Sequence, residues 1–126
     1  MKKYLPFLIA FLLPVLALAQ TVPLATSHWG GTITTTNTWQ VIQGKNNGRN
    51  GCTVQNNGSH TMYVYFDSAG TAACSAGSVG NSFALAPNSN GVAGQALNCA
   101  IASNLILSSQ VCIYGTSGDA FTADFQ

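Results

Sequence analysis

The sequence predicts an all-β chain that folds as a small single-domain antiparallel β-sandwich, jelly-roll-like, with two disulfides. Short apolar and aromatic bursts recur about every ten residues between Gly, Asn, Ser and Pro, a pattern typical of a sandwich or small barrel. Within one burst, Met62 and Val64 alternate with Tyr63 and Tyr65, the period of a half-buried strand. The cysteine count is even. These three observations favour the sandwich.

The N-terminus has the pattern of an export signal. Two lysines precede an apolar run over residues 5–16, and small residues at Ala17 and Ala19 then provide a cleavage site. A membrane anchor is the alternative, but this run contains two prolines and is shorter than the roughly 20 residues that span a bilayer. We therefore expect a signal peptide over residues 1–19 and a β-sandwich domain over residues 20–126, secreted or periplasmic and free of the membrane after cleavage.

Charge is scarce in the domain. Its two cations and three aspartates give a net charge of −1, and glutamate is absent. So few cations exclude nucleic acid as a partner, because affinity for phosphates comes mainly from Lys and Arg. Few charges also leave the edge strands without the charged side chains that normally deter pairing with another chain. Either the edges are covered, by closure of the sheet or by neighbouring copies, or they are short and bulged in a monomer. The charged residues are Lys45, Arg49, Asp67, Asp119 and Asp124.

Four cysteines in an exported domain indicate two disulfides. A structural zinc site would need cysteines a few residues apart, which this chain lacks, so we predict no metal and no cofactor. Three pairings are open. We predict Cys52–Cys112, which would join two strand-like segments, and Cys74–Cys99, which would join two loop-flanked segments.

In chain order, a polar extended arm over 21–28 precedes a first strand within 32–42. The segment 52–66 predicts a hairpin about Asn57-Gly58, because Asn tolerates and Gly freely adopts the positive φ of a type I′ turn. Further strands or apolar bursts follow, and alternating Phe121, Ala123 and Phe125 predict a packed C-terminal strand. These later segments cover residues 83–86, 97–101, 105–107, 111–114 and 121–125.

Groups that carry catalysis are few. The chain has no G-x-S-x-G nucleophile elbow and no Gly-rich phosphate loop. The chain contains the residue types of a Ser-His-Asp site. However, His60 lies beside the predicted turn, where a histidine is usually a solvated polar residue. His28 has no metal partner near it in the sequence. We predict that the protein is not an enzyme.

Aromatic residues in polar surroundings are the candidate binding surface. Tyr63 and Tyr65 should project opposite Met62 and Val64, and exposed aromatics offer large area with a polar handle for sugars or proteins. The alternative is that these rings cover the second sheet of the sandwich. The candidate surface comprises Trp29, Trp39, Tyr63 and Tyr65.

Two stretches, CTVQNNGSHTMYVYF from Cys52 and VCIYGTSGDAF from Val111, carry a resemblance. Their strand ends and turns resemble those of small β-sandwich proteins encoded among bacteriophage and prophage virion genes. The resemblance implies a capsid-decorating, tail or fibre-type structural role without catalysis. The secretory signal and the cysteines depart from that pattern and favour a domain of this type used outside the cytoplasm.

We therefore expect an exported non-enzymatic structural and binding module in a surface or virion-like assembly. Its partners would be copies of itself or other surface or virion proteins. The alternative is a free secreted carbohydrate-binding module or adhesin with glycans as ligands. In that case Trp29, Trp39, Tyr63 and Tyr65 would bind the glycan.

Overall fold

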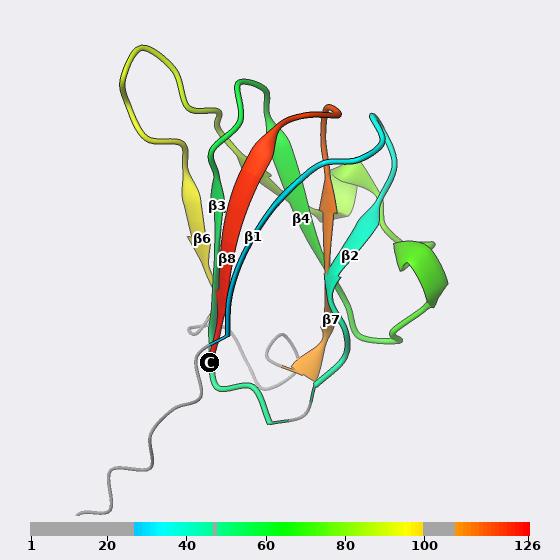
Figure 1. Cartoon of the computed structure of the whole chain (residues 1–126). Coiled ribbons are helices and arrows are strands. Elements are labelled where there is room, and N and C mark those ends of the chain that lie inside the picture. Colours follow the sequence, from blue (N-terminus) through cyan, green and yellow to red (C-terminus); the bar gives the residue numbers. More distant parts are fainter. Residues whose placement is uncertain (1–26, 47, 100–107) are drawn as a thin grey trace, which may run out of the picture.

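Eight strands in the described part of the chain form two antiparallel sheets that pack face to face (Figure 1). The structure is a computed structural model and describes residues 27–46, 48–99 and 108–126. The strand orders are β1-β8-β3-β6 and β2-β7-β4-β5. Two short 3-10 turns, η1 and η2, lie between β4 and β5. The bounds are β1 Ser27–Thr32, β2 Gln40–Gln43, β3 Cys52–Asn56, β4 Met62–Asp67, η1 Ala72–Cys74, η2 Val79–Asn81, β5 Phe83–Leu85, β6 Ala96–Asn98, β7 Gln110–Tyr114 and β8 Ala120–Phe125.

This strand order is that of a jelly roll, which confirms the predicted fold class. The chain passes from one sheet to the other at every connection except the one between β4 and β5. Each sheet thus gains strands from both halves of the sequence, and the first and last strands are neighbours, β1 pairing antiparallel to β8. Apart from β4 and β5, the paired strands are not consecutive in the sequence, which is the double Greek-key arrangement of jelly rolls.

The core lies between the sheets and follows the period-two alternation. Val54 on β3 and Val64 on β4 are fully buried, and Phe121, Ala123 and Phe125 point inward from β8. The prediction of a packed C-terminal strand is thereby confirmed. Burying each large aliphatic or aromatic side chain contributes about 1.5–3 kcal/mol, so this inner layer is the main source of stability.

The predicted hairpin over 52–66 is wrong. Both strands exist, but β3 pairs with β6 and β8 whereas β4 pairs with β5 and β7, so the segment crosses from one sheet to the other. Neither Asn57 nor Gly58 has positive φ. Each strand has one apolar face, and placing the strands in opposite sheets lets those faces meet across the core.

A turn with the predicted chemistry occurs elsewhere. Asn90 and Gly91 have φ of 52° and 76°. Their flanking residues, Ser89 and Val92, exchange both backbone hydrogen bonds, at 3.2 and 2.9 Å. Positive φ at both central positions is the requirement of a type I′ turn. This Asn-Gly pair caps the protruding loop between β5 and β6 (Figure 1).

Other boundaries also differ from expectation. β1 occupies part of the segment expected to be an extended arm, and the expected strand over 32–42 is divided by a crossing between the sheets. Within that crossing Ile33 is buried in the core, while Asn37 has a φ of 56°. The predicted signal over 1–19 and the apolar burst at 105–107 lie outside the described residues.

The predicted disulfide pairing is wrong, although the prediction of two disulfides is confirmed. The bonds are Cys52–Cys99, with 5.1 Å between Cα atoms, and Cys74–Cys112, with 6.1 Å. Cys112 is opposite Tyr65 in the β4–β7 register, so its side chain lies on the outer face of that sheet, whereas Cys52 points into the core from β3. The two cysteines of the expected Cys52–Cys112 bond therefore lie in different layers. Disulfides of this kind indicate an oxidising compartment, extracellular or periplasmic.

Three of the four sheet edges have the short or irregular form that deters pairing. β5 and β6 have three residues each, and β2 has four, with a register shift between Val41 and Gln43. β1 is the exception, with six residues. None of the helical segments that the structure describes is long and apolar enough to cross a membrane.

Candidate binding face and the Ser59–His60–Asp119 cluster

The strongest candidate for a binding site is on the outer side of the β2-β7-β4-β5 sheet. Tyr63 and Tyr65 project outward from β4 while Met62 and Val64 are buried, as the alternation predicted. Tyr114 on β7 lies opposite Tyr63 in register and shares this face. The rings therefore do not lie between the sheets.

Trp39, immediately before β2, completes the group. Its ring centroid is 5.1 Å from that of Tyr114 and 5.8 Å from that of Tyr65, and Tyr63 is 5.9 Å from Tyr114. The interplanar angles are 43°, 60° and 71° respectively, so the rings form a faceted surface and not a flat one. All four side chains are partly exposed. We call Trp39, Tyr63, Tyr65 and Tyr114 the aromatic face.

One end of the aromatic face is covered by the loop between β4 and β5. The Cys74–Cys112 disulfide ties η1 to the outer side of β7, and Figure 1 shows the short helical turns on this side of the sheet. Farther along the loop, a Cβ at Gly77 would lie only 2.8 Å from the Trp39 ring. Only glycine permits this close approach, so the loop packs directly on the indole.

Asp67 anchors the start of the same loop. Its buried carboxylate accepts hydrogen bonds from the backbone N–H groups of Ala69, Gly70 and Thr71, and from the Thr71 hydroxyl. The Thr71 hydroxyl and these backbone donors hold the pKa of Asp67 below its ordinary value, despite the opposing effect of burial. The carboxylate is thus occupied in holding the loop.

The predicted set of four aromatics divides between the two sheets. Trp29 lies on β1, 45 % exposed, with its ring edge-to-face against Phe121 at 5.9 Å. It does not join Trp39, Tyr63 and Tyr65. Tyr114 was not among the predicted residues. Side chains alternate along β7, so Tyr114 lies on the same outer face as Cys112, whereas Val111 and Ile113 point into the core.

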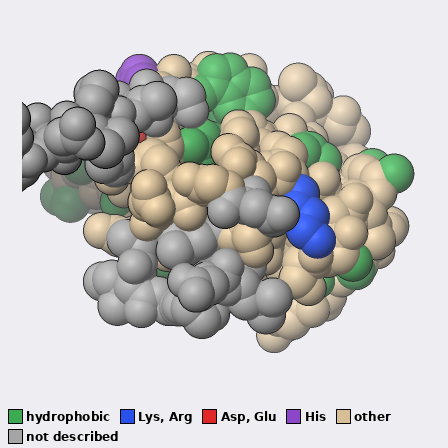
Figure 2. Space-filling view, turned by 90° about the horizontal axis from the view of Figure 1, so that it is seen from below, with side chains coloured by type: hydrophobic (Ala, Val, Ile, Leu, Met, Phe, Trp, Pro, Cys, Tyr) green, Lys and Arg blue, Asp and Glu red, His purple; other side chains and the backbone are tan. Residues whose placement is uncertain are grey.

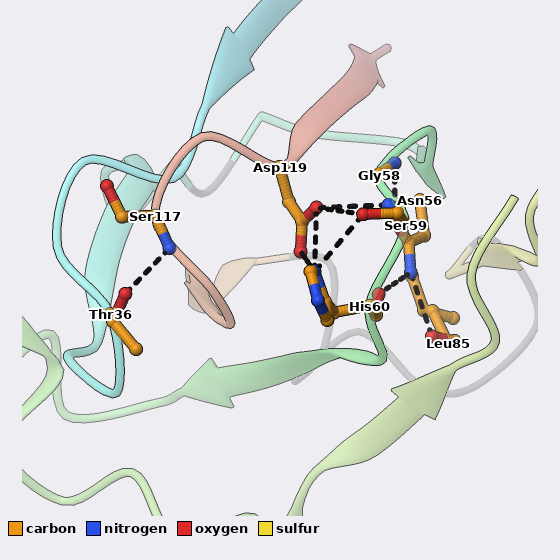
Figure 3. Close-up of polar contacts among 8 residues, drawn as sticks. All are labelled: Thr36, Asn56, Gly58, Ser59, His60, Leu85, Ser117 and Asp119. Atoms are coloured by element: carbon orange, nitrogen blue, oxygen red, sulfur yellow. Dashed lines mark hydrogen bonds and ion pairs between the residues drawn. The ribbon is translucent and has the colours of Figure 1, made fainter.

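A second cluster brings together a serine, a histidine and an aspartate (Figure 3). His60 Nδ1 lies 3.1 Å from Asp119 Oδ2, and Ser59 Oγ lies 3.2 Å from the same ring nitrogen. In a Ser-His-Asp relay the serine and the carboxylate bond to opposite nitrogens of the imidazole. Here both lie on Nδ1, so the geometry differs from that relay.

The cluster fastens two turns to each other. The Ser59 N–H donates to Asp119 Oδ1 at 3.0 Å, and a Cβ on Gly58 would collide with the Asp119 side chain. On the other side of the second turn, the Ser117 N–H donates to Thr36 Oγ1 at 2.9 Å (Figure 3). The buried Asp119 carboxylate therefore connects the β3–β4 crossing to the turn before β8.

The guanidinium of Arg49 is also used inside the protein. It donates to the carbonyls of Ser109 and Gly44, both at 3.0 Å, and lies 5.1 Å from the centre of the Phe125 ring. Burial lowers the pKa of Arg49. On the described part of the face in Figure 2, neutral side chains and backbone predominate and Lys or Arg atoms appear at one place.

Metal-binding geometry is absent from the part of the chain that the structure describes: His, Cys, Asp and Glu nowhere gather in groups of three or more. Comparison of the chain with protein-family models, with curated proteins and with solved structures found no match. What the two candidate sites can do therefore follows from their own residues.

Proposed function

We propose that this chain is an exported, non-enzymatic structural and binding module whose copies associate in a surface or virion-like assembly through the edge of β1. The observation that carries the proposal is this edge. β1, SHWGGT, has six residues without Lys, Glu, Asp, Arg or Pro, the residues that commonly protect an edge from pairing. Among the described residues, no strand pairs with the outer side of β1, and an edge strand of this kind is a template for a strand of a second copy.

The distribution of charge supports association. Three of the charged residues, Arg49, Asp67 and Asp119, are buried and bonded within the fold. The surface is left with little charge to repel another copy, and low net charge promotes association. The jelly roll is used by viral capsid and lectin domains, which agrees with the proposal by analogy of fold alone.

Density-gradient fractionation of non-reduced culture supernatant and periplasm tests the proposal. The processed chain is followed by mass spectrometry, which also reports where the signal is cleaved. We expect the chain to sediment with a particle much larger than itself. A single species with the mass of one processed chain would contradict the proposal.

A matched pair of lysine substitutions tests the edge itself. A Cβ at Gly30 on β1 would make only ordinary contacts, the nearest at 3.7 Å, and Gly44 has no atom within 4 Å, so both positions accept a side chain. Gly30→Lys should reduce the assembled fraction at least tenfold, because it places a charge on the edge strand. Gly44→Lys adds the same charge elsewhere and should leave assembly unchanged. Equal effects of the two substitutions would rule out the β1 edge.

A further inference from the structure

We infer that the aromatic face binds a neutral glycan as a single free chain, with sugar rings stacked on Tyr63 and Tyr114 and the chain reaching the exposed part of Trp39 beside them. This face belongs to the β2-β7-β4-β5 sheet, whereas β1 belongs to the other sheet. Glycan binding is therefore independent of association through β1.

The chemistry of the face matches a sugar. An aromatic ring presents a negative face, onto which the weakly positive C–H groups of a pyranose pack. The phenol hydroxyls of Tyr63 and Tyr114 add hydrogen-bonding groups at the rim of the rings. Partly exposed rings that contact one another hold their orientation before a ligand arrives, which lowers the entropy lost on binding.

The absence of available charge defines the ligand as neutral. Among the described residues of β2, β4, β5 and β7, the charged one is Asp67, and it is only 1 % exposed. Its carboxylate is engaged by four donors from the following loop. A face with no charge to offer gains nothing from an acidic or basic ligand, and desolvating such a ligand would cost free energy.

One end of the aromatic face is open. Tyr63 is flanked across the sheet by Ala84 on β5, which is small and exposed, and by Tyr114 on β7. At the other end, Tyr65 pairs with Cys112, where the disulfide to Cys74 holds the loop against the sheet. A ligand therefore approaches the Tyr63 end and reaches Trp39 over Tyr114.

The tilt of the rings selects a single chain. Tyr63 and Tyr114 meet at 71° and Trp39 and Tyr114 at 43°, so no plane passes along all three rings. A flat crystalline polysaccharide would touch one ring at a time, whereas a free chain can turn its successive sugars to follow the facets.

The two tryptophans of the chain allow a selective assay. In a Trp29→Phe background, Trp39 is the sole indole and its fluorescence reports on the aromatic face. The full processed chain is titrated with soluble β-glucan, mannan, xylan and galactan, and the same polymers are tested by affinity gel electrophoresis. We expect at least one to give a saturable change in Trp39 fluorescence and retarded migration. Alginate, which is anionic, and microcrystalline cellulose, which is flat, should give neither.

Substitutions locate the binding. Tyr63→Ala should weaken affinity at least tenfold, while Tyr63→Phe, which keeps the ring, should stay within about threefold. Phe83→Ala is the matched control, because Phe83 is 48 % exposed on neighbouring β5 but pairs with Val64 and faces the opposite side. If Tyr63→Ala does not fold, Tyr114→Ala replaces it.

Three results would overturn the inference. No neutral polymer changes the fluorescence or the migration, or binding survives loss of the Tyr63 or Tyr114 ring. The third is a Trp39 signal that changes with protein concentration alone, which would mean that a second copy occupies the face.

Discussion

Replacing Asn56 with alanine should destabilise the fold more than removing any other side-chain amide at the crossing between β3 and β4. Asn56 is fully buried at the end of β3. Its Nδ2 donates to the carbonyls of His60, at 2.9 Å, and Leu85, at 3.0 Å, and its Oδ1 accepts from the Gly58 N–H at 2.9 Å (Figure 3). These bonds shape the β3–β4 crossing and tie it to β5 of the opposite sheet.

The expected magnitude follows from those three bonds. Each contributes about 1 kcal/mol net, and buried partners left unsatisfied cost at least as much, so Asn56→Ala should lower the free energy of unfolding by about 3 kcal/mol. With a typical urea slope of about 1–3 kcal/mol per molar, the unfolding midpoint should fall by about 1–3 M. Urea unfolding with both disulfides intact, followed by circular dichroism, measures the shift.

Asn57→Ala is the matched control. The side chain of Asn57 makes one hydrogen bond, to Thr122 Oγ1 at 3.2 Å, and is only partly buried. Its loss should cost less than about 1 kcal/mol. Equal midpoint shifts for the two alanine variants would refute the role of the Asn56 amide in holding the crossing.

Three further predictions concern stability. The pKa of Asp67 is lowered in the folded protein, so the stabilisation from its carboxylate is present above the unfolded pKa of about 3.9 and is lost as pH falls through the folded pKa. The difference in unfolding free energy between wild type and Asp67→Asn, measured in urea titrations, should therefore be full at neutral pH and shrink below about pH 4. Replacing both Cys74 and Cys112 with serine opens a loop of sequence separation 38, so unfolding free energy should fall by about 4 kcal/mol, and a loss under about 1 kcal/mol would contradict the chain-entropy account. Gly94→Ala places a Cβ against the backbone carbonyl of the β3 end and should cost more than about 2 kcal/mol by calorimetry, whereas Gly44→Ala, with no atom within 4 Å, should be close to neutral.

The local pattern of the sequence was sufficient for the strands from β3 onward that it marked by alternation, and for which side of those strands is buried, but not for β1 and β2. Met62 and Val64 against Tyr63 and Tyr65, and Phe121, Ala123 and Phe125 at the C-terminus, were predicted correctly because side chains alternate along a strand whichever sheet it joins. Tyr63 and Tyr65 of the aromatic face followed from the same reasoning, whereas Trp39 was selected for its polar surroundings in the sequence.

Pairing between distant segments was decided by the tertiary structure. The Asn57-Gly58 pair has the composition of a tight hairpin, but buried Asn56 and the Asp119 carboxylate hold it as a crossing between sheets. The predicted cysteine pairing was wrong for the same reason. The face of the sheet on which Cys112 lies depends on the register of β7 against β4, and the residues next to Cys112 in the sequence do not encode that register.

The sequence alone therefore determined an all-β sandwich with two disulfides and outward-facing tyrosines, because these depend on composition and on the period of the strand. The tertiary structure decided which strands pair within the predicted jelly-roll-like sandwich, the disulfide partners, the separation of Trp29 from Trp39 and the addition of Tyr114 to the aromatic face. Those features depend on contacts between residues far apart in the chain, and the alternation within one strand is compatible with many such pairings.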